Sequence, residues 1–233
     1  MISQVSEFRL LDRNFKKTIC LVPGWATDYR IFSALDLDYN YLLPIKFSPF
    51  NFKDGLSALL NKKSLDKISL LGWSLGAFLA AEFAAGNPGR TDELILVSMR
   101  KNFEPKTLEV VRGQLKKNKK AYLYKFYLDC FSDSEREGLS WFKKNLLRDY
   151  ISKMELKDLR DGLDYLSCAH LNFKSLASIK KVKFFHGLED KIAPGKETEE
   201  IRSHMPQAEF VYMARCGHIP FLSKIFREKF YNG

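Results

Sequence analysis

The sequence Gly-Trp-Ser-Leu-Gly, residues 72–76, constrains the fold of this chain more than any other segment. An apolar run at residues 68–72 precedes it, and the Ala- and Leu-rich residues 73–85 that follow are typical of a helix. A strand that enters a helix through Gly-x-Ser-x-Gly makes a sharp turn, which exposes the serine hydroxyl at the carboxyl edge of a sheet. The two glycines let strand and helix approach closely. We therefore predict that Ser74 is a nucleophile.

Other short apolar runs are spaced as the strands of one sheet would be. They occupy residues 18–24, 40–47, 94–98, 182–187 and 209–213. Helical stretches, for instance residues 196–205, separate most of them. Mostly apolar strands that alternate with helices predict an α/β fold, with a mostly parallel central sheet covered by helices on both faces.

Residues 100–172 break this alternation, because they contain no convincing strand and read as helices with long charged faces. They stand between two predicted strands. We therefore expect residues 1–99 and 173–233 to form the core, and residues 100–172 to form a helical cap inserted into it.

A serine hydroxyl needs a base to remove its proton, and on such a fold an acid and then a histidine follow the serine along the chain. His218 lies just after the last predicted strand and is the expected base. Asp190, in the loop after the preceding strand, is the expected acid that orients it. Glu189 is the alternative acid, in which case Asp190 would only cap the next helix. The remaining histidines are expected to be structural: His170, His186 and His204.

Acyl transfer also needs hydrogen-bond donors aimed at the developing oxyanion. The backbone N–H of Leu75, directly after the nucleophile, is one expected donor. The turn after the first predicted strand, Pro-Gly-Trp at residues 23–25, is placed to supply the second through the backbone N–H of Trp25. The indole of Trp25 would also form a wall of the pocket.

These motifs make the chain resemble the α/β hydrolases, and more narrowly the pimeloyl-acyl carrier protein methyl ester esterases of biotin synthesis. The resemblance covers nearly the whole chain and rests on Pro-Gly-Trp25, the segment around Ser74, His-Gly-Leu-Glu-Asp190 and Gly-His218-Ile-Pro-Phe. Two positions depart from the family pattern: residue 23 is proline where histidine is common, and residue 77 is alanine where glycine is usual.

The resemblance implies a serine carboxylesterase that hydrolyses the methyl ester of pimeloyl-acyl carrier protein without metal or cofactor. It further implies that Trp25 and Leu75 form the oxyanion hole, and that Phe126 lines the acyl channel. Residues 110–128 hold six cations and no carboxylate, interleaved with Tyr122, Tyr124, Phe126 and Tyr127. The apolar residues of this stretch are expected to line the channel while the cations face outward, where they would steer an acidic carrier protein. The alternative is a solvated amphipathic helix whose lysines have no specific partner. The candidate docking residues are Arg112, Lys116, Lys117, Lys119 and Lys120.

Composition narrows the alternatives. Of 233 residues, 45% are hydrophobic and 28% charged, which excludes disorder and a disulfide-stapled miniprotein.

The net charge of +10 would suit nucleic acid, but no zinc-finger spacing, RNP-type motif or helix-turn-helix accompanies it. The opening residues lack the apolar core of a signal peptide, and no apolar run reaches about 18 residues. Four widely spaced cysteines suit reduced thiols.

We therefore expect a cytoplasmic monomer that binds neither nucleic acid nor membranes. Three other functions remain open from the sequence. The first is a general short-chain carboxylesterase or thioesterase, and the second is a lyase of the menaquinone pathway with the same triad. The third is a receptor without activity on the hydrolase fold, because fold alone does not determine function.

Overall fold

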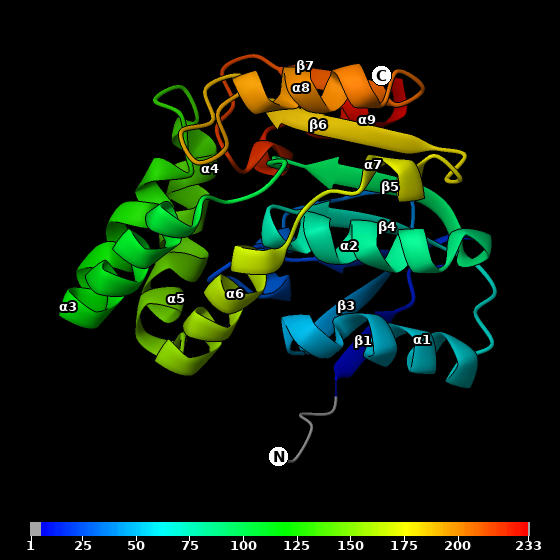
Figure 1. Cartoon of the computed structure of the whole chain (residues 1–233), viewed down its shortest axis with the longest axis horizontal. Helices are drawn as coiled ribbons and strands as arrows, with labels where there is room; N and C mark the ends of the chain where they lie inside the picture. Colours follow the sequence, from blue (N-terminus) through cyan, green and yellow to red (C-terminus); the bar gives the residue numbers. More distant parts are fainter. Residues whose placement is uncertain (1–5, 233) are drawn as a thin grey trace.

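One twisted sheet organises the computed structural model, which describes residues 6–232 (Figure 1). Its strands lie in the order β1-β3-β2-β4-β5-β6-β7, and every neighbouring pair is parallel except β1 and β3. The strands are β1 (Glu7–Leu11), β2 (Thr18–Val22), β3 (Asn40–Lys46), β4 (Ile68–Trp73), β5 (Thr91–Val97), β6 (Val182–Gly187) and β7 (Glu209–Met213). The prediction of a mostly parallel sheet is confirmed.

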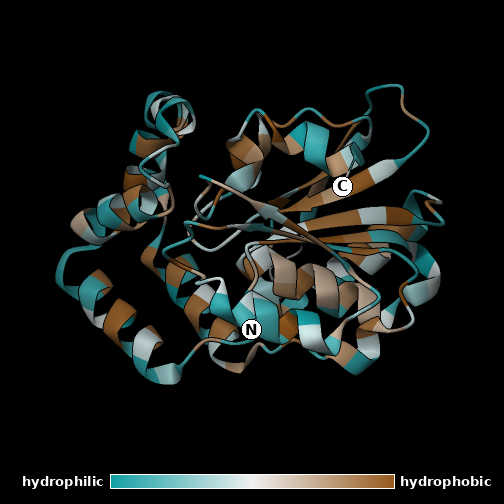
Figure 2. Cartoon of the chain, turned by 90° about the horizontal axis from the view of Figure 1, so that it is seen from above, coloured by the Kyte–Doolittle hydropathy of each residue, from teal (hydrophilic) through white to brown (hydrophobic). Residues whose placement is uncertain are grey.

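The central strands of the sheet are covered on both faces, so their residues are apolar. Every residue of β4 is buried, and so are most residues of the following helix α2 (Leu75–Gly86). A helix that is apolar all round belongs inside a protein rather than at its surface. Figure 2 shows these strands mostly in the brown of hydrophobic residues. The strand–turn–helix unit around Ser74 is therefore anchored in the core.

Strand β1 was not predicted from the sequence. It pairs antiparallel with β3 at the edge of the sheet, with Leu10 opposite Leu42, and four of its five residues are exposed. A strand with so little buried surface has no apolar alternation to reveal it. Strand β5 also begins earlier than predicted, at Thr91 rather than residue 94.

Nine α-helices occur in the described part of the chain. Those outside the interval 100–172 are α1 (Phe52–Lys62), α2, α7 (Phe173–Leu176), α8 (Lys196–His204) and α9 (Phe226–Asn232). Within that interval lie α3 (Pro105–Asp129), α4 (Arg136–Phe142), α5 (Arg148–Lys153) and α6 (Leu156–Cys168), with a π-helical turn at Lys143–Leu147. We refer to residues 105–168 as the helical segment.

The helical segment gathers beyond the arrowheads of β5 and β6, at the carboxyl ends of the parallel strands (Figure 1). This edge is where ligands bind in open α/β sheets. Helix α3 is kinked at Asn118, which has φ of −158° and ψ of 88° and whose side chain accepts the N–H of Ala121 at 3.0 Å. The Asn118 side chain thus caps the second half of α3.

No helix in residues 6–232 combines the length and the apolarity needed to cross a membrane.

Candidate active site

Ser74 lies in the turn between β4 and α2, with φ of 55° and ψ of −116°. Such a backbone conformation is strained by about 1–3 kcal/mol in a non-glycine residue. The Ser74 N–H donates to the Val97 carbonyl at 2.9 Å, which ties the turn to β5. A Cβ on Gly72 would lie 2.2 Å from the Gly76 carbonyl oxygen, and one on Gly76 would lie 2.2 Å from the Val22 carbonyl oxygen. Only glycine fits either position, so the motif builds a tight turn with Ser74 at its apex.

Asp190 and His218 come together from the loops after β6 and β7. The Asp190 Oδ2 lies 2.7 Å from Nδ1 of His218, and its Oδ1 accepts the backbone N–H groups of Ile192 and Ala193, each at 2.8 Å. Burial by itself would raise the pKa of Asp190, but the charge of His218 and the hydrogen bonds lower it below its ordinary value. Glu189 is exposed, so Asp190 rather than Glu189 orients the ring, while also capping the turn that follows.

Hydrogen bonds from several parts of the chain hold the loop that carries His218. Its backbone N–H donates to the Cys130 carbonyl at 2.8 Å, and its carbonyl accepts the indole N–H of Trp73 at 2.6 Å. The N–H of Gly217 donates to the Glu135 carboxylate at 2.7 Å. Burial raises the pKa of Glu135, although the N–H groups that it accepts oppose this shift. Cys130 and Glu135 belong to the helical segment, so this segment helps to position the histidine.

The other ring nitrogen of His218, Nε2, is buried and makes no hydrogen bond within residues 6–232. The structure therefore joins Asp190 to His218 but shows no hydrogen bond between His218 and Ser74. A catalytic hydrogen bond is often long in a free enzyme and tightens when the substrate binds. A ring nitrogen that has no hydrogen-bond partner, as is the case for Nε2 among the described residues, is free to accept a proton from a hydroxyl group.

The turn at Gly24 and Trp25 packs directly against the strand–turn–helix unit. A Cβ on Gly24 would lie 2.8 Å from the Trp73 ring and 3.2 Å from Cβ of Ser74. The backbone N–H groups of Trp25 and Leu75 have no protein acceptor among the described residues. Leu75 is also the first residue of α2, where the helix dipole favours negative charge. Two free donors thus flank Ser74.

The indole of Trp25 is fixed by the helical segment. Its Nε1 donates to the Leu159 carbonyl of α6 at 2.8 Å, and its ring contacts those of Phe126 and Tyr122 at 5.0 and 6.4 Å between centroids. A Cβ on Gly162 would lie 2.6 Å from the indole, so α6 packs closely on Trp25.

A cavity of about 280 Å³ opens beside Ser74, between the sheet edge and the helical segment. Its walls are mostly apolar, and its lining residues are Trp25, Ser74, Arg100, Phe103, Thr107, Leu108, Val111, Tyr122, Phe126, Leu163, Leu166, Lys191, Ile192 and Pro194. A larger cleft of about 570 Å³ lies between α1, α2 and the residues after α6, and its lining does not include Ser74. The smaller cavity is therefore the one that can present an apolar ligand to the serine.

The four aromatic residues in the second half of α3 have three different positions. Tyr122 and Phe126 line the cavity. Tyr124 is exposed, and Tyr127 is buried in the core beneath the channel. The helical period turns Tyr124 and Tyr127 to other faces of α3 than Tyr122 and Phe126.

The candidate docking cations also differ among themselves. Arg112 lies 2.7 Å from the Asp164 carboxylate and 3.0 Å from that of Glu109, and Lys119 donates to the Met154 carbonyl at 2.6 Å. These two cations are held within the helical segment. Among the five candidate docking cations, Lys116, Lys117 and Lys120 are exposed and have no ion pair within residues 6–232.

In the described part of the chain, the other three histidines do not contact the Asp190–His218 pair through a hydrogen bond. His204 stacks on Phe173, with 4.8 Å between ring centroids, and His170 is exposed. His186 is buried with neither ring nitrogen hydrogen-bonded within residues 6–232, and burial lowers its pKa. No cluster of three His, Cys, Asp or Glu side chains that could hold a metal ion occurs in this part of the chain.

The sequence did not reveal the residues that hold the His218 loop. Glu135 reaches Gly217 across 82 positions, and it stands in a charged stretch with no distinguishing motif. The Cys130 carbonyl is a backbone group, so no side-chain pattern could have indicated it.

Two curated proteins with the same name match most of the chain. No protein-family profile matches the chain. A protein of Nitrosomonas europaea is 29% identical over 189 residues, which is 76% of this chain and 73% of the relative. One of Citrobacter koseri is 22% identical over 227 residues, 88% of each chain. Both are named pimeloyl-[acyl-carrier protein] methyl ester esterase.

Solved structures match over nearly the whole length. A bromoperoxidase from Bacillus anthracis has a TM-score of 0.84 at 16% identity, covering 97% of this chain and 94% of its own. An esterase from Exiguobacterium antarcticum has a TM-score of 0.78 at 16% identity, with 97% and 92% covered. An α/β hydrolase from a deep-sea metagenome reaches 0.76 at 18% identity, with 97% and 90% covered. At these identities the likeness shows a shared fold.

Proposed function

We propose that this chain, an α/β hydrolase similar in sequence to the pimeloyl-[acyl-carrier protein] methyl ester esterases, is a serine carboxylesterase with Ser74, His218 and Asp190 as its triad. The observation that carries the proposal is the buried contact of 2.7 Å between Asp190 and His218. It leaves Nε2 of His218 without a partner among the described residues, at the same edge of the sheet as the strained Ser74. The order serine, acid, histidine along the chain supports it as well.

The reaction would proceed in two steps. His218 Nε2 takes the hydroxyl proton of Ser74 as Oγ attacks the ester carbonyl, and the tetrahedral oxyanion is stabilised by the backbone N–H groups of Trp25 and Leu75. The methoxy group leaves with the proton from His218 as methanol. Water then loses a proton to the same nitrogen and attacks the acyl-enzyme, which releases the carboxylic acid and restores the Ser74 hydroxyl. No group beyond these residues is required.

The apolar cavity supports a substrate with an extended acyl chain. Phe126 and Tyr122 from α3, with Leu163 from α6, would bury the methylenes, so that the helical segment acts as a cap over Ser74. We propose the methyl ester of pimeloyl-acyl carrier protein as the substrate, by analogy with the names of the two relatives, and therefore a role in biotin synthesis.

The carrier protein would dock on the exposed face of α3 around its kink. Lys116, Lys117 and Lys120 are exposed around the kink and unpaired among the described residues, and the chain carries a net charge of +10. An acyl carrier protein is acidic, so such a surface would speed the encounter in a salt-dependent manner.

The test is hydrolysis of pimeloyl-acyl carrier protein methyl ester by the purified wild type and by Ser74→Ala. We expect rapid demethylation by wild type and a loss of several orders of magnitude in kcat for the variant. Ser98→Ala is the matched control, because Ser98 is also a buried serine at positive φ after a strand, namely β5. It should leave kcat unchanged.

Two outcomes distinguish the proposed esterase activity from the proposed substrate. Wild type that cleaves a short p-nitrophenyl ester but not the carrier-bound methyl ester would keep the esterase and remove the biotin role. Full activity in Ser74→Ala would remove the triad itself.

A further inference from the structure

We infer that Thr27 and Tyr127 position the oxyanion donor at Trp25, because their hydroxyl groups hold the backbone carbonyls of its two neighbours, Gly24 and Ala26. The inference deepens the proposed function and rests on it. Neither hydroxyl belongs to the triad, and Thr27 lies in a turn where the sequence marked only Trp25.

The Thr27 hydroxyl acts on the donor peptide itself. Its Oγ1 donates to the Gly24 carbonyl at 2.9 Å. That carbonyl and the N–H of Trp25 belong to the same planar peptide group, which is trans here. Holding the carbonyl therefore fixes the direction in which the Trp25 N–H points. A hydrogen bond to the carbonyl also polarises the peptide and strengthens its N–H as a donor.

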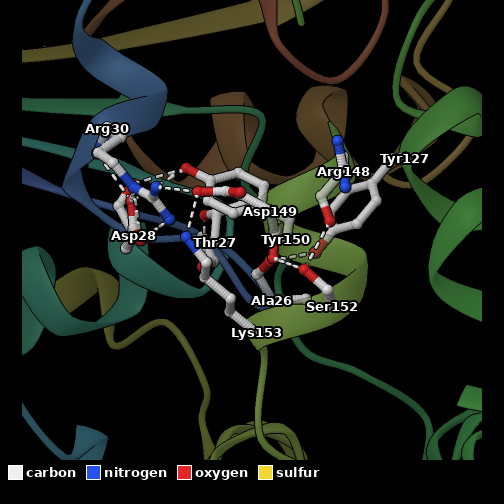
Figure 3. A network of polar contacts seen from close by, with 11 residues as sticks. Ala26, Thr27, Asp28, Arg30, Tyr127, Arg148, Asp149, Tyr150, Ser152 and Lys153 are labelled. Atoms are coloured by element: carbon white, nitrogen blue, oxygen red, sulfur yellow. Dashed lines mark hydrogen bonds and ion pairs between the residues drawn. The ribbon is translucent and has the colours of Figure 1, made fainter. Parts of the chain in front are cut away.

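The next residue is held from the other side of the molecule. Ala26 has φ of 60°, a left-handed conformation that a residue with a Cβ adopts only when its surroundings enforce it. The Ala26 carbonyl accepts the hydroxyl of Tyr127, a buried residue of α3 (Figure 3). The Tyr127 ring packs against Phe142 and Tyr150, with centroid distances of 5.4 and 5.8 Å. Its hydroxyl is thus a fixed donor that keeps Ala26 in this conformation.

The far end of the turn is tied to α5. Asp28 accepts the Tyr150 hydroxyl at 3.1 Å and the backbone N–H of Arg30 at 2.9 Å, and Arg30 reaches the Asp149 carboxylate at 2.9 Å (Figure 3). Residues 26–28 are therefore gripped by α3 and α5 together. The helical segment would thus have two tasks, since it covers the cavity and also aims a catalytic donor.

A purely structural role makes a different prediction from a positioning role. If these hydroxyls only stabilised the turn, their removal would lower the melting temperature and leave kcat unchanged for the folded fraction. If they aim the donor, kcat falls while KM changes little, because the oxyanion exists only in the transition state.

The experiment compares Thr27→Val, which keeps the shape and removes the hydroxyl, with Thr27→Ser, which keeps the hydroxyl. Tyr127→Phe tests the second bond. Thr91→Val is the matched control, because Thr91 Oγ1 also donates to a backbone carbonyl, that of Asn87 at 3.1 Å, at the far end of β5. We measure kcat and KM on a p-nitrophenyl ester, and the rate of labelling of Ser74 by a fluorophosphonate, whose phosphoryl oxygen occupies the oxyanion site.

We expect kcat and the labelling rate to fall roughly tenfold in Thr27→Val, less than the hundredfold or more for losing a donor outright, with KM nearly constant. Thr27→Ser should recover most of the rate, Tyr127→Phe should show a smaller loss of the same kind, and Thr91→Val should lose stability alone.

Wild-type rates in Thr27→Val, or a loss that Thr27→Ser does not recover, would overturn the inference while leaving the triad intact. If Thr27→Val does not fold, Tyr127→Phe with an unchanged kcat and labelling rate overturns it in the same way. Wild type that is neither labelled at Ser74 nor active would instead remove the proposed function, and the inference with it.

Discussion

The sheet edge and the helical segment are built on different principles, although they meet at one cavity. Strand β4 and helix α2 are buried almost throughout, and the turn between them depends on backbone contacts that only glycine permits. Helix α3 spans 25 residues, of which only Leu108, Leu115, Leu123 and Tyr127 are buried. Figure 2 shows the same contrast, since the helices beyond the sheet mix teal and brown along their length.

This difference in burial indicates where amino-acid substitutions are tolerated. At the sheet edge, the positions of Ser74 and Asp190 follow from backbone geometry, so a substitution there alters chemistry or folding at once. In the helical segment most side chains reach solvent, so substitutions there should alter what binds and leave the core in place. The following predictions test this division.

The largest effect is expected for Asp190→Asn. The amide cannot stabilise the imidazolium and favours the wrong tautomer of His218, so kcat should fall about 10³- to 10⁴-fold. The measurement is kcat on a p-nitrophenyl ester, with Glu189→Gln as the control that keeps wild-type activity. Equal losses in the two variants would mean that the acid is wrongly identified.

The same carboxylate makes stability depend on pH. Its pKa is lowered in the folded state relative to about 3.9 in an unfolded chain. The resulting stabilisation is present above about pH 4 and is lost as the pH falls through the folded value. Urea titrations should therefore show the wild type and Asp190→Asn converging in unfolding free energy at acid pH. A constant difference between them would contradict this.

Gly76→Ala should damage folding more than any single change in the helical segment. The added Cβ would lie 2.2 Å from the Val22 carbonyl oxygen, inside a packed core. We expect a loss of roughly 3 kcal/mol in unfolding free energy, measured from the urea midpoint at constant m. A stable variant would mean that β2 and α2 can separate, and the contrast between the two regions would weaken.

Reversing the charges of Lys116, Lys117 and Lys120 to Glu should act on the partner alone. Exposed charges contribute about 0.2–1 kcal/mol each, so KM for the carrier-bound ester should rise about tenfold at low salt. A free p-nitrophenyl ester should be hydrolysed as before. Replacing Lys125, which pairs with Asp129, is the matched control on the same helix. An equal effect of that single replacement would show that Lys116, Lys117 and Lys120 do not form a distinct docking surface.

The smallest effect is expected for Gly113→Ala in α3. This glycine is exposed, and a Cβ on it would meet no atom within 4 Å. Alanine should stabilise the chain by about 0.5–1 kcal/mol because it restricts the unfolded state and favours the helix. Thermal unfolding measures the gain. A loss of stability would show that α3 needs flexibility at this position.

How much the sequence revealed follows the same division. The strands β2 to β7 and the turn at Ser74 were predicted, because buried parallel strands are apolar runs and the glycine spacing is local. Strand β1 was missed because its residues are mostly exposed. Arg112 was grouped with free cations, yet it pairs with Asp164, which is 52 positions further along the chain.

The sequence by itself determined the elements whose causes are local. The glycines at 72 and 76, the serine between them and the loops after β6 and β7 are enough to indicate a serine, an acid and a histidine at one sheet edge. Tertiary structure decided which side chains serve them: Asp190 rather than Glu189 on His218, Glu135 on the histidine loop, Tyr127 on the turn after Trp25. These contacts join residues up to 101 positions apart, and packing alone sets which of many similar side chains reaches a given atom.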